Sequence, residues 1–148
     1  MITLSVSAQT GNSFFSFQDS TFHIGQIHRT NCTLNGEWNE SLSLECDSLI
    51  MFLKTHPELT VEIGWHSDSR PIPITNDTLT LLKARTTVKL LVEKGVHLEQ
   101  LVAKGYGSKF PIISDEEINR LKFNSEKESA HLTNRRLEIK ILAIRNSK

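Results

Sequence analysis

Residues 61–70, which read VEIGWHSDSR, decide the fold of this chain. The apolar residues Val61, Ile63 and Trp65 alternate with polar or small ones, which is the period of a β-strand with one buried face. Polar residues follow at once, so we expect the strand to end in a loop. Asp68 in that loop is a candidate ligand-binding residue. The alternative is a loop aspartate that accepts hydrogen bonds from nearby backbone amides.

Amphipathic helices are expected on both sides of this strand. The upstream helix is predicted from apolar residues spaced i, i+4, i+7, i+8 and i+11: Leu42, Cys46, Leu49, Ile50 and Leu53. It should end before Pro57, because a residue before proline is pushed out of the helical region. The downstream helix should be capped by Asn76 or Thr75. It should run to about Lys94, where Gly95 ends it.

The rest of the chain supplies further strands and a charged segment. One or two short strands are expected within residues 12–30, a third strand within 101–106, and a closing strand over 137–141, where apolar and charged residues alternate. The charged residues 114–132 suit a surface helix or an ordered loop. The order β-α-β-α-β-β predicts an α+β fold, a two-layer α/β sandwich with helices packed on one face of a mixed β-sheet.

Length and charge limit the classes of function. A chain of 148 residues is enough for one domain, which we place at residues 21–148. Residues 1–20 form an N-terminal extension, either the remnant of an export signal or an ordinary chain terminus. Seventeen basic residues balance seventeen acidic ones, so no global field favours nucleic acid or anionic lipid. No apolar run reaches the roughly 20 residues that span a bilayer, so we expect no membrane span.

The sequence contains no pattern typical of a catalytic site or a metal site. His66 and Asp68 could present two metal ligands, but no cluster has the paired spacing of a zinc site. No nucleophile elbow or phosphate loop occurs in the sequence. We therefore expect no metal, no cofactor and no enzymatic activity. Cys46 falls on a predicted helix face as a small hydrophobe, and a Cys32–Cys46 disulfide is the alternative in an oxidising compartment.

Four blocks of this sequence resemble, in order and spacing, the OmpA-like peptidoglycan-binding domain family (the OmpA/Pal/MotB type). Residues 61–70 are similar to its strand ending in Gly-His-Thr-Asp, and residues 76–84 to its Asn-x-x-Leu-Ser-x-x-Arg-Ala helix. Residues 103–111 are similar to its third strand and turn, and residues 134–138 to its Asn-Arg-Arg strand entry. The resemblance covers about residues 35–142.

The resemblance extends to a subgroup and implies a fold. The spacing of Glu128, His131 and Asn134 is similar to that of a subgroup common in Bacteroidetes-type bacteria. Membership of the family implies a two-layer sandwich that binds peptidoglycan non-covalently. It also implies a periplasmic location, associated with the outer membrane.

The family's mode of binding implies roles for particular residues. The peptide stem of Gram-negative peptidoglycan contains diaminopimelate, whose free end is an ammonium beside a carboxylate. In the family, a loop aspartate binds the ammonium and a helix arginine binds the carboxylate. Asp68 matches that aspartate, but Lys83 stands where the family has arginine. Lysine keeps the charge and lacks the planar fork that binds a carboxylate with two hydrogen bonds. A plain solvated helix lysine is the alternative for Lys83.

Three further residues are candidates for ligand contact. Asn76 is read as the helix cap first and as a ligand contact second. Arg135 and Arg136 alternate across the start of the last strand, so one should point to each face. In the family this pair helps to form the pocket floor. The alternative is a structural ion pair with residues 115–128. Arg85 lies two positions beyond Lys83, which on a helix turns it about 200° away.

Together the sequence predicts a non-enzymatic module that binds the diaminopimelate stem of peptidoglycan and anchors an envelope protein to the cell wall. The expected partners are peptidoglycan and other envelope proteins, and not nucleic acid. The competing hypothesis is a protein-interaction module in an envelope secretion or motility complex, with a weakened wall-binding site.

Overall fold

The computed structural model describes residues 13–30, 44–72 and 74–146. Its main helices and strands follow the predicted order, with a short 3-10 turn added before the third strand and two helices added before the last strand. The strands are β1 (Ile27–Thr30), β2 (Leu59–His66), β3 (Leu101–Gly105) and β4 (Arg136–Ile144). The helices are α1 (Leu44–Thr55), α2 (Asn76–Glu93), α3 (Asp115–Arg120) and α4 (Asn124–Asn134), with a short 3-10 turn η1 (Leu98–Gln100) before β3.

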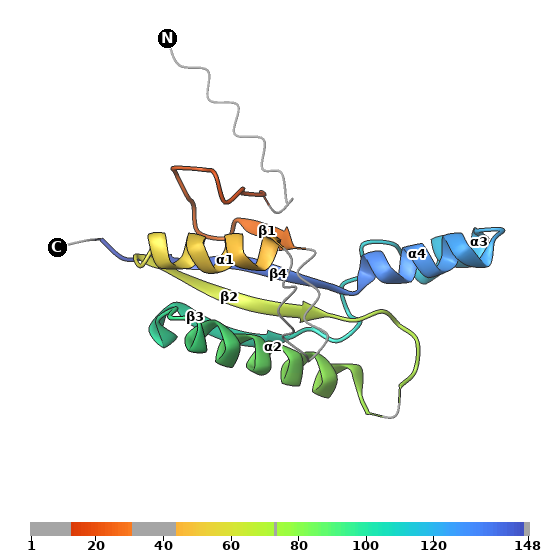
Figure 1. Cartoon of the computed structure of the whole chain (residues 1–148). Helices are drawn as coiled ribbons and strands as arrows, with labels where there is room; N and C mark the ends of the chain where they lie inside the picture. The colour runs from red at the N-terminus through yellow and green to blue at the C-terminus, as the bar shows by residue number, and fades with distance from the viewer. Residues whose placement is uncertain (1–12, 31–43, 73, 147–148) are drawn as a thin grey trace, which may run out of the picture.

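The four strands form one mixed sheet in the order β1-β4-β2-β3, stacked from top to bottom in Figure 1. β2 and β3 run parallel, and β4 is antiparallel to both β1 and β2. A parallel pair needs a crossover connection, and α2 provides it. The fold class predicted from the sequence is confirmed.

Helices α1 and α2 cover one face of the sheet, α1 beside β1 and β4 and α2 along β3 (Figure 1). The core between them contains the residues that alternate inward on β2 and β4, together with the inner faces of the helices: Leu49, Phe52, Leu53, Val61, Ile63, Trp65, Ala84, Leu91, Leu137, Ile139 and Ile141. The indole N–H of Trp65 donates to Thr87 Oγ1 at 2.9 Å, which satisfies the polar atom of this ring inside the core.

Helix α2 begins and ends at the expected places, and of the two residues expected to cap it the cap is Thr75. The Thr75 hydroxyl accepts the backbone N–H of Thr78 at 3.2 Å, whereas Asn76 is already the first helical residue. The cap assignment for Asn76 was therefore wrong, because the side chain one position earlier reaches the free amides. Gly95 follows the helix with φ of 93°, a conformation that glycine adopts at low cost.

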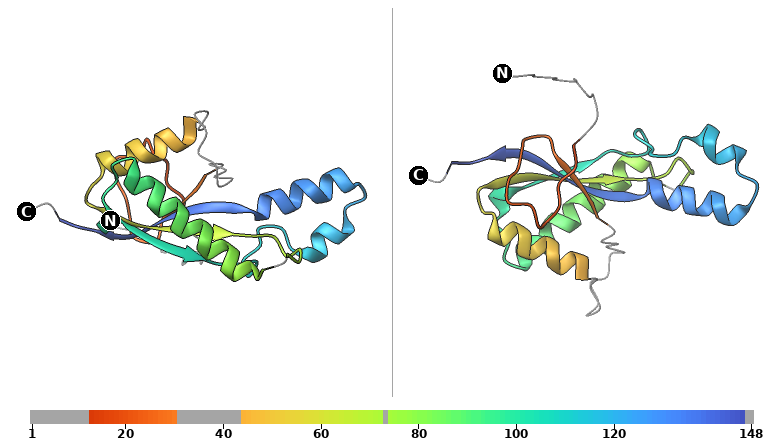
Figure 2. Two further views of the ribbon diagram at one scale, coloured as in Figure 1. Left: turned by 60° about the horizontal axis from the view of Figure 1, so that its bottom comes forward. Right: turned by 90° about the horizontal axis from the view of Figure 1, so that it is seen from above.

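The charged residues 114–132 form two helices that extend past the end of the sheet (Figures 1 and 2). α3 starts with a capping box, in which the side chains of Ser114 and Glu117 each bond to the other's backbone amide. The prediction that this segment suits a surface helix or an ordered loop is thus confirmed, with two helices in place of one. Their sequences are too polar to supply a wide apolar stripe, so they remain largely in solvent.

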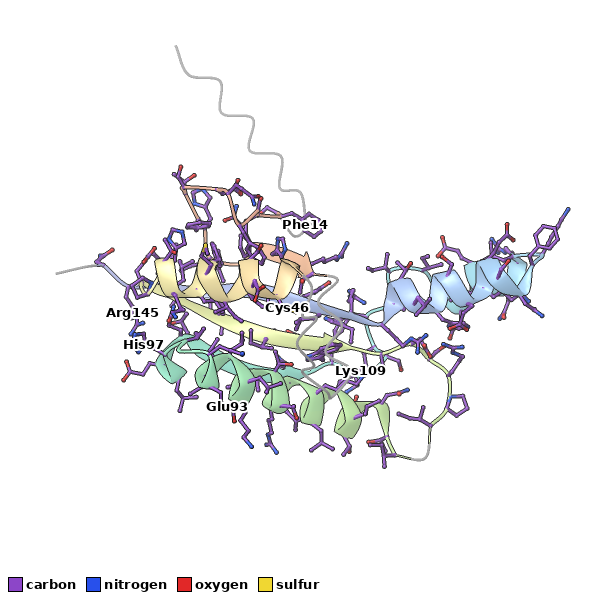
Figure 3. The ribbon with its side chains drawn as sticks, in the orientation of Figure 1. Phe14, Cys46, Glu93, His97, Lys109 and Arg145 are labelled. Carbon is purple, nitrogen blue, oxygen red and sulfur yellow. The ribbon has the colours of Figure 1, made fainter. Side chains whose placement is uncertain are left out.

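The N-terminal part of the described chain packs on the domain. Phe15 is buried, and its ring lies 5.6 Å from that of Phe52 on α1. Phe14 bridges to Ile27 of β1. Its exposed ring, labelled in Figure 3, lies 4.8 Å below the Arg29 guanidinium. Residues 13–20 therefore contact the core through Phe15 and Phe17.

Strand β2 is buried on both faces, which corrects the prediction of one buried face. Glu62 and His66 point away from the helices, yet they are 7% and 5% exposed. Their cover is a polar layer on this outer face of the sheet, described below.

Cys46 is buried on α1, and Cys32 lies outside the described residues. None of the described helices combines the length and the apolar character that crossing a membrane requires.

Candidate ligand-binding pocket

A pocket of about 440 Å³ lies where the β2–α2 loop, the first half of α2 and the end of α4 meet. In Figure 1 this loop turns beside α4 before it enters α2. The pocket lies at the opposite end of α2 from Glu93, which is labelled in Figure 3. Its walls carry five charged side chains and several apolar ones: Ser67, Asp68, Arg70, Pro71, Ile72, Asn76, Leu79, Lys83, Glu128 and Arg135.

Four of the five residues predicted to bind ligand line this pocket: Asp68, Asn76, Lys83 and Arg135. They come from a loop, a helix start, the middle of the same helix and the entry to β4. The structure does not bring Arg136 to them. As the strand alternation predicts, Arg135 and Arg136 point to opposite faces of the sheet, and Arg136 lines a second hollow.

Asp68 is 6% exposed and already bound on both carboxylate oxygens. Its Oδ1 accepts the backbone N–H of Arg70 at 3.0 Å and the Nε–H of Arg70 at 3.1 Å. Its Oδ2 accepts Nη2–H of Arg70 at 2.8 Å and lies 3.1 Å from Nε of Arg135. Burial acts to raise the pKa of Asp68, but the hydrogen bonds from Arg70 and the charges of Arg70 and Arg135 together outweigh it and hold this pKa below its ordinary value.

Glu128 on α4 holds both arginines from the other side. It accepts Nη1–H of Arg70 at 2.7 Å and Nη2–H of Arg135 at 3.0 Å. The Arg70 hydrogen bond is the main reason that the pKa of Glu128 lies below its ordinary value. The alternative hypothesis of a structural ion pair with residues 115–128 thus applies to Arg135. Two arginines and two carboxylates form one connected network.

Lys83 is half-buried and has a different environment. Its ammonium lies over the Trp65 ring, 5.1 Å from the ring centroid, within cation–π distance. Burial, and then the nearby charge of Arg135, lower the pKa of Lys83. Within the described part of the chain, no carboxylate lies within ion-pair distance of Lys83. Arg85 is exposed and does not line the pocket, as its angle on the helix predicts.

Local hydrogen bonds hold the loop and the helix start in position. The Asn76 amide donates to the backbone oxygen of Asp68 at 3.3 Å, which ties the loop to α2. Lys109, labelled in Figure 3, reaches Asp77 on the first turn of α2 at 2.9 Å. Asn76 therefore has a positioning contact to Asp68 in addition to its place in the pocket wall.

The end of α4 is fixed by Asn134, which is almost fully buried. Its Oδ1 accepts the backbone N–H groups of Ile112 and Ile113 at 2.8 and 2.9 Å, and its amide donates to the Ile113 oxygen at 2.8 Å. Arg135 follows directly, so these bonds set where its side chain begins.

A second hollow of about 220 Å³ lies on the outer face of the sheet, where Arg136 is placed. Arg136 donates to Glu138 at 2.7 Å, and His66 Nε2 lies 3.3 Å from the same carboxylate. The His66 ring stacks on Tyr106, with centroids 4.6 Å apart, and the Tyr106 hydroxyl donates to Glu62. Burial and this bond raise the pKa of Tyr106. This polar layer covers the outer face of β2.

His66 lines the hollow on the outer face of the sheet, whereas Asp68 lines the pocket beside α2. These two residues therefore do not form a joint metal site. Over the described ranges, no three His, Cys, Asp or Glu side chains gather in a way that could hold a metal ion.

Arg70 contacts both carboxylates of the pocket, although no role was predicted for it from the sequence. The available signal was the Asp-x-Arg spacing in a turn, where an aspartate accepts the backbone amide two residues on. That spacing allows the arginine fork to reach back to the same carboxylate.

Comparison with solved structures finds the same fold in other proteins. The periplasmic domain of Helicobacter pylori MotB aligns with a TM-score of 0.57 at 20% identity, over 71% of this chain and 64% of that one. A putative MotB-like protein from Desulfovibrio vulgaris aligns with a TM-score of 0.52 at 18% identity, over 72% and 64%. The cell wall anchor of the T6SS from Pseudomonas aeruginosa aligns with a TM-score of 0.52 at 22% identity, over 71% of each chain.

These likenesses show a shared fold. This chain spans less than two thirds of the length of both MotB-type structures. No family model matches the sequence, and no curated protein matches it significantly.

Proposed function

We propose that this protein binds peptidoglycan non-covalently through the pocket formed by Asp68, Asn76, Lys83 and Arg135, and so holds an envelope protein to the cell wall. The observation that carries the proposal is the convergence of these four residues. They are spread over nearly 70 positions of sequence, each is predicted from the sequence to bind ligand, and they line one pocket. The ligand is the stem peptide, at its diaminopimelate end, and the location is the periplasm, in association with the outer membrane.

The chemistry of the pocket supports a charged ligand of this kind. It has three cationic side chains against two carboxylates, and apolar walls from Pro71, Ile72 and Leu79 reduce the exposure of the ligand to water. Likeness to a domain described as a cell wall anchor supports the same proposal. The activity proposed is binding, without turnover.

Co-sedimentation with isolated sacculi tests this function. The wild-type protein should pellet with sacculi, and free diaminopimelate should release it. Lys83→Glu reverses a charge inside the pocket and should abolish pelleting. Arg85→Glu makes the same change in charge on the same helix, outside the pocket, and should pellet like the wild type. Equal pelleting of the two variants would show that this pocket is not the wall-binding site.

One observation favours the protein-interaction hypothesis. The Asp68 carboxylate, which is expected to bind the ligand ammonium, already contacts Arg70 and Arg135. A folded wild-type protein that fails to pellet with sacculi would favour that hypothesis. The Bacteroidetes-type placement rests only on the spacing of Glu128, His131 and Asn134. Two of these have structural roles in this chain, and the structural neighbours named above do not support the subgroup.

A further inference from the structure

We infer that this pocket recognises its ligand through a carboxylate, and that Arg70 is the specificity-determining residue because it occupies the aspartate that would otherwise bind an ammonium. The inference rests on the proposed function, since it concerns the same pocket and names the chemical group that the pocket reads.

The first step is the number of acceptor positions on Asp68. An ionised carboxylate offers about four lone-pair positions to hydrogen-bond donors. Arg70 donates to three of them, through its backbone amide, Nε and Nη2, and Arg135 faces the fourth. Asp68 is also 6% exposed. A ligand ammonium would have to displace a guanidinium before it could reach either oxygen.

The second step is how firmly Arg70 is held. The Arg70 fork contacts two carboxylates at once, since its Nη1 lies 2.7 Å from Glu128 and its Nη2 lies 2.8 Å from Asp68. Charge-assisted bonds from a guanidinium are stronger than neutral ones and fixed in geometry. An ammonium brings only three donors around a single point, so it cannot replace both of these contacts from one position.

The third step is the cation that has no anionic partner. Lys83 has none within the described chain, is half-buried, and lies close enough to Arg135 for repulsion between the two charges to count. Both Lys83 and Arg135 line the pocket. A carboxylate bound beside them would relieve this repulsion and give Lys83 a partner, whereas an added ammonium would increase it. The pocket therefore favours a ligand group with negative charge and disfavours one with positive charge.

The chemical class that follows is an exposed carboxylate on a flexible aliphatic chain, with or without a neighbouring amine. Three compounds with similar carbon chains distinguish recognition of a carboxylate from recognition of an amine. Pimelate has two carboxylates and no amine, diaminopimelate has both groups, and cadaverine has two amines and no carboxylate. Binding of each to the full chain can be measured by calorimetric titration or by NMR shifts of the Trp65 indole, which lies under Lys83.

For the wild-type protein, pimelate and diaminopimelate should bind with affinities within about threefold of each other, and cadaverine should not bind. Arg70→Ala keeps the backbone amide but frees the two acceptor positions on Asp68 that Nε and Nη2 occupy, so diaminopimelate should gain at least about tenfold over pimelate. Arg85→Ala removes the same charge from an exposed position outside the pocket, and should leave the ratio of the two affinities unchanged.

The outcomes separate this inference from the proposed function. If sacculi bind the protein and wild type prefers diaminopimelate over pimelate by tenfold or more, the inference falls and the proposed function stands. If pimelate binds at this pocket but sacculi do not, the proposed function falls and the carboxylate preference stands. Because the wild-type series needs no variant, failure of Arg70→Ala to fold does not prevent the test. An unchanged ratio in a folded Arg70→Ala would remove Arg70 from the specificity role.

Discussion

The charged residues of the pocket differ in whether they already have partners of opposite charge within the chain. Asp68 and Glu128 lie between Arg70 and Arg135, so their charges are met within the chain. Lys83 lies across the pocket on α2, where the Trp65 ring is its neighbour. Interactions between charges strengthen as water is excluded, so a ligand should gain most binding free energy from a contact with Lys83.

Replacing Lys83 by arginine should tighten binding to peptidoglycan that contains diaminopimelate. Arginine keeps the charge but offers two parallel donors matched to a carboxylate, whereas lysine offers a single flexible point. We expect a gain of about 1 kcal/mol, or roughly fivefold in affinity, in a sacculus-binding titration. Arg85→Lys is the matched control on the same helix and should change nothing. A loss of binding with Arg85→Lys would mean that Arg85 is the carboxylate ligand.

At this scale, the sequence predicted those pocket residues that match the motif of the family it resembles. Asp68 and Lys83 were found because strand, loop and helix register are local properties of sequence. Arg70 was missed because its role depends on side-chain geometry, which places one fork between a loop carboxylate and Glu128, 58 positions away. Arg136 was placed in the pocket because alternation predicts two faces but does not say which face carries the ligand.

Among the elements, α2 and β3 approach so closely that a glycine is required between them. A Cβ at Gly105 would lie 2.3 Å from the backbone nitrogen of Leu81 and 2.8 Å from Oγ1 of Thr80. That hydroxyl accepts the backbone N–H of Gly107 at 2.9 Å and is part of the contact that holds the β3 turn on α2.

Gly105→Ala should therefore destabilise the protein by about 1 to 3 kcal/mol, since one of the two elements must move to admit the methyl group. Urea unfolding of the purified variant measures this cost. Val102→Ala, at a half-exposed position on the same strand, is the control and should cost much less. Equal midpoints and slopes for Gly105→Ala and the wild type would show that α2 and β3 lie further apart than this contact implies.

The elements themselves were largely predictable, and their pairing was not. Helix α1 and strand β4 follow apolar periodicities that a short window of sequence contains. The neighbours of β4 are β1 and β2, which lie far away in the sequence, so no local pattern could indicate the order β1-β4-β2-β3. Residues 114–132 lacked a clear period because α3 and α4 bury only a few side chains, including Ile118 and Ala130.

In the whole molecule, the sheet separates an apolar layer from a polar one. Helices α1 and α2 bury one face, while the outer face carries Glu62 and Glu138 under a cover of arginine, histidine and tyrosine side chains. Both carboxylates are less than 10% exposed. Such buried charge contributes to stability only while its partners remain in place, so protonation on this face should weaken the fold as a unit.

Glu138 should make stability depend on acid pH. Burial acts to raise its pKa, but its contacts with His66, Arg136 and Arg29 outweigh burial and hold the pKa well below its ordinary value. The unfolded chain therefore binds this proton more readily than the folded chain does. The stabilisation from Glu138 is fully present above its unfolded pKa of about 4.3 and is lost as pH falls toward the lower folded value.

Urea unfolding between pH 7 and pH 3 measures this dependence. The free energy of unfolding should fall below about pH 4 in the wild type, and it should fall less steeply in Glu138→Gln, which has no proton to take up at this position. At pH 7, Glu138→Gln should be the less stable protein, because two arginines lose their buried counter-charge. Glu116→Gln, an exposed position on α3, should keep the wild-type slope. If Glu138→Gln also kept the full wild-type slope, the acid sensitivity would be assigned to the pocket, where the pKa values of Asp68 and Glu128 are both depressed.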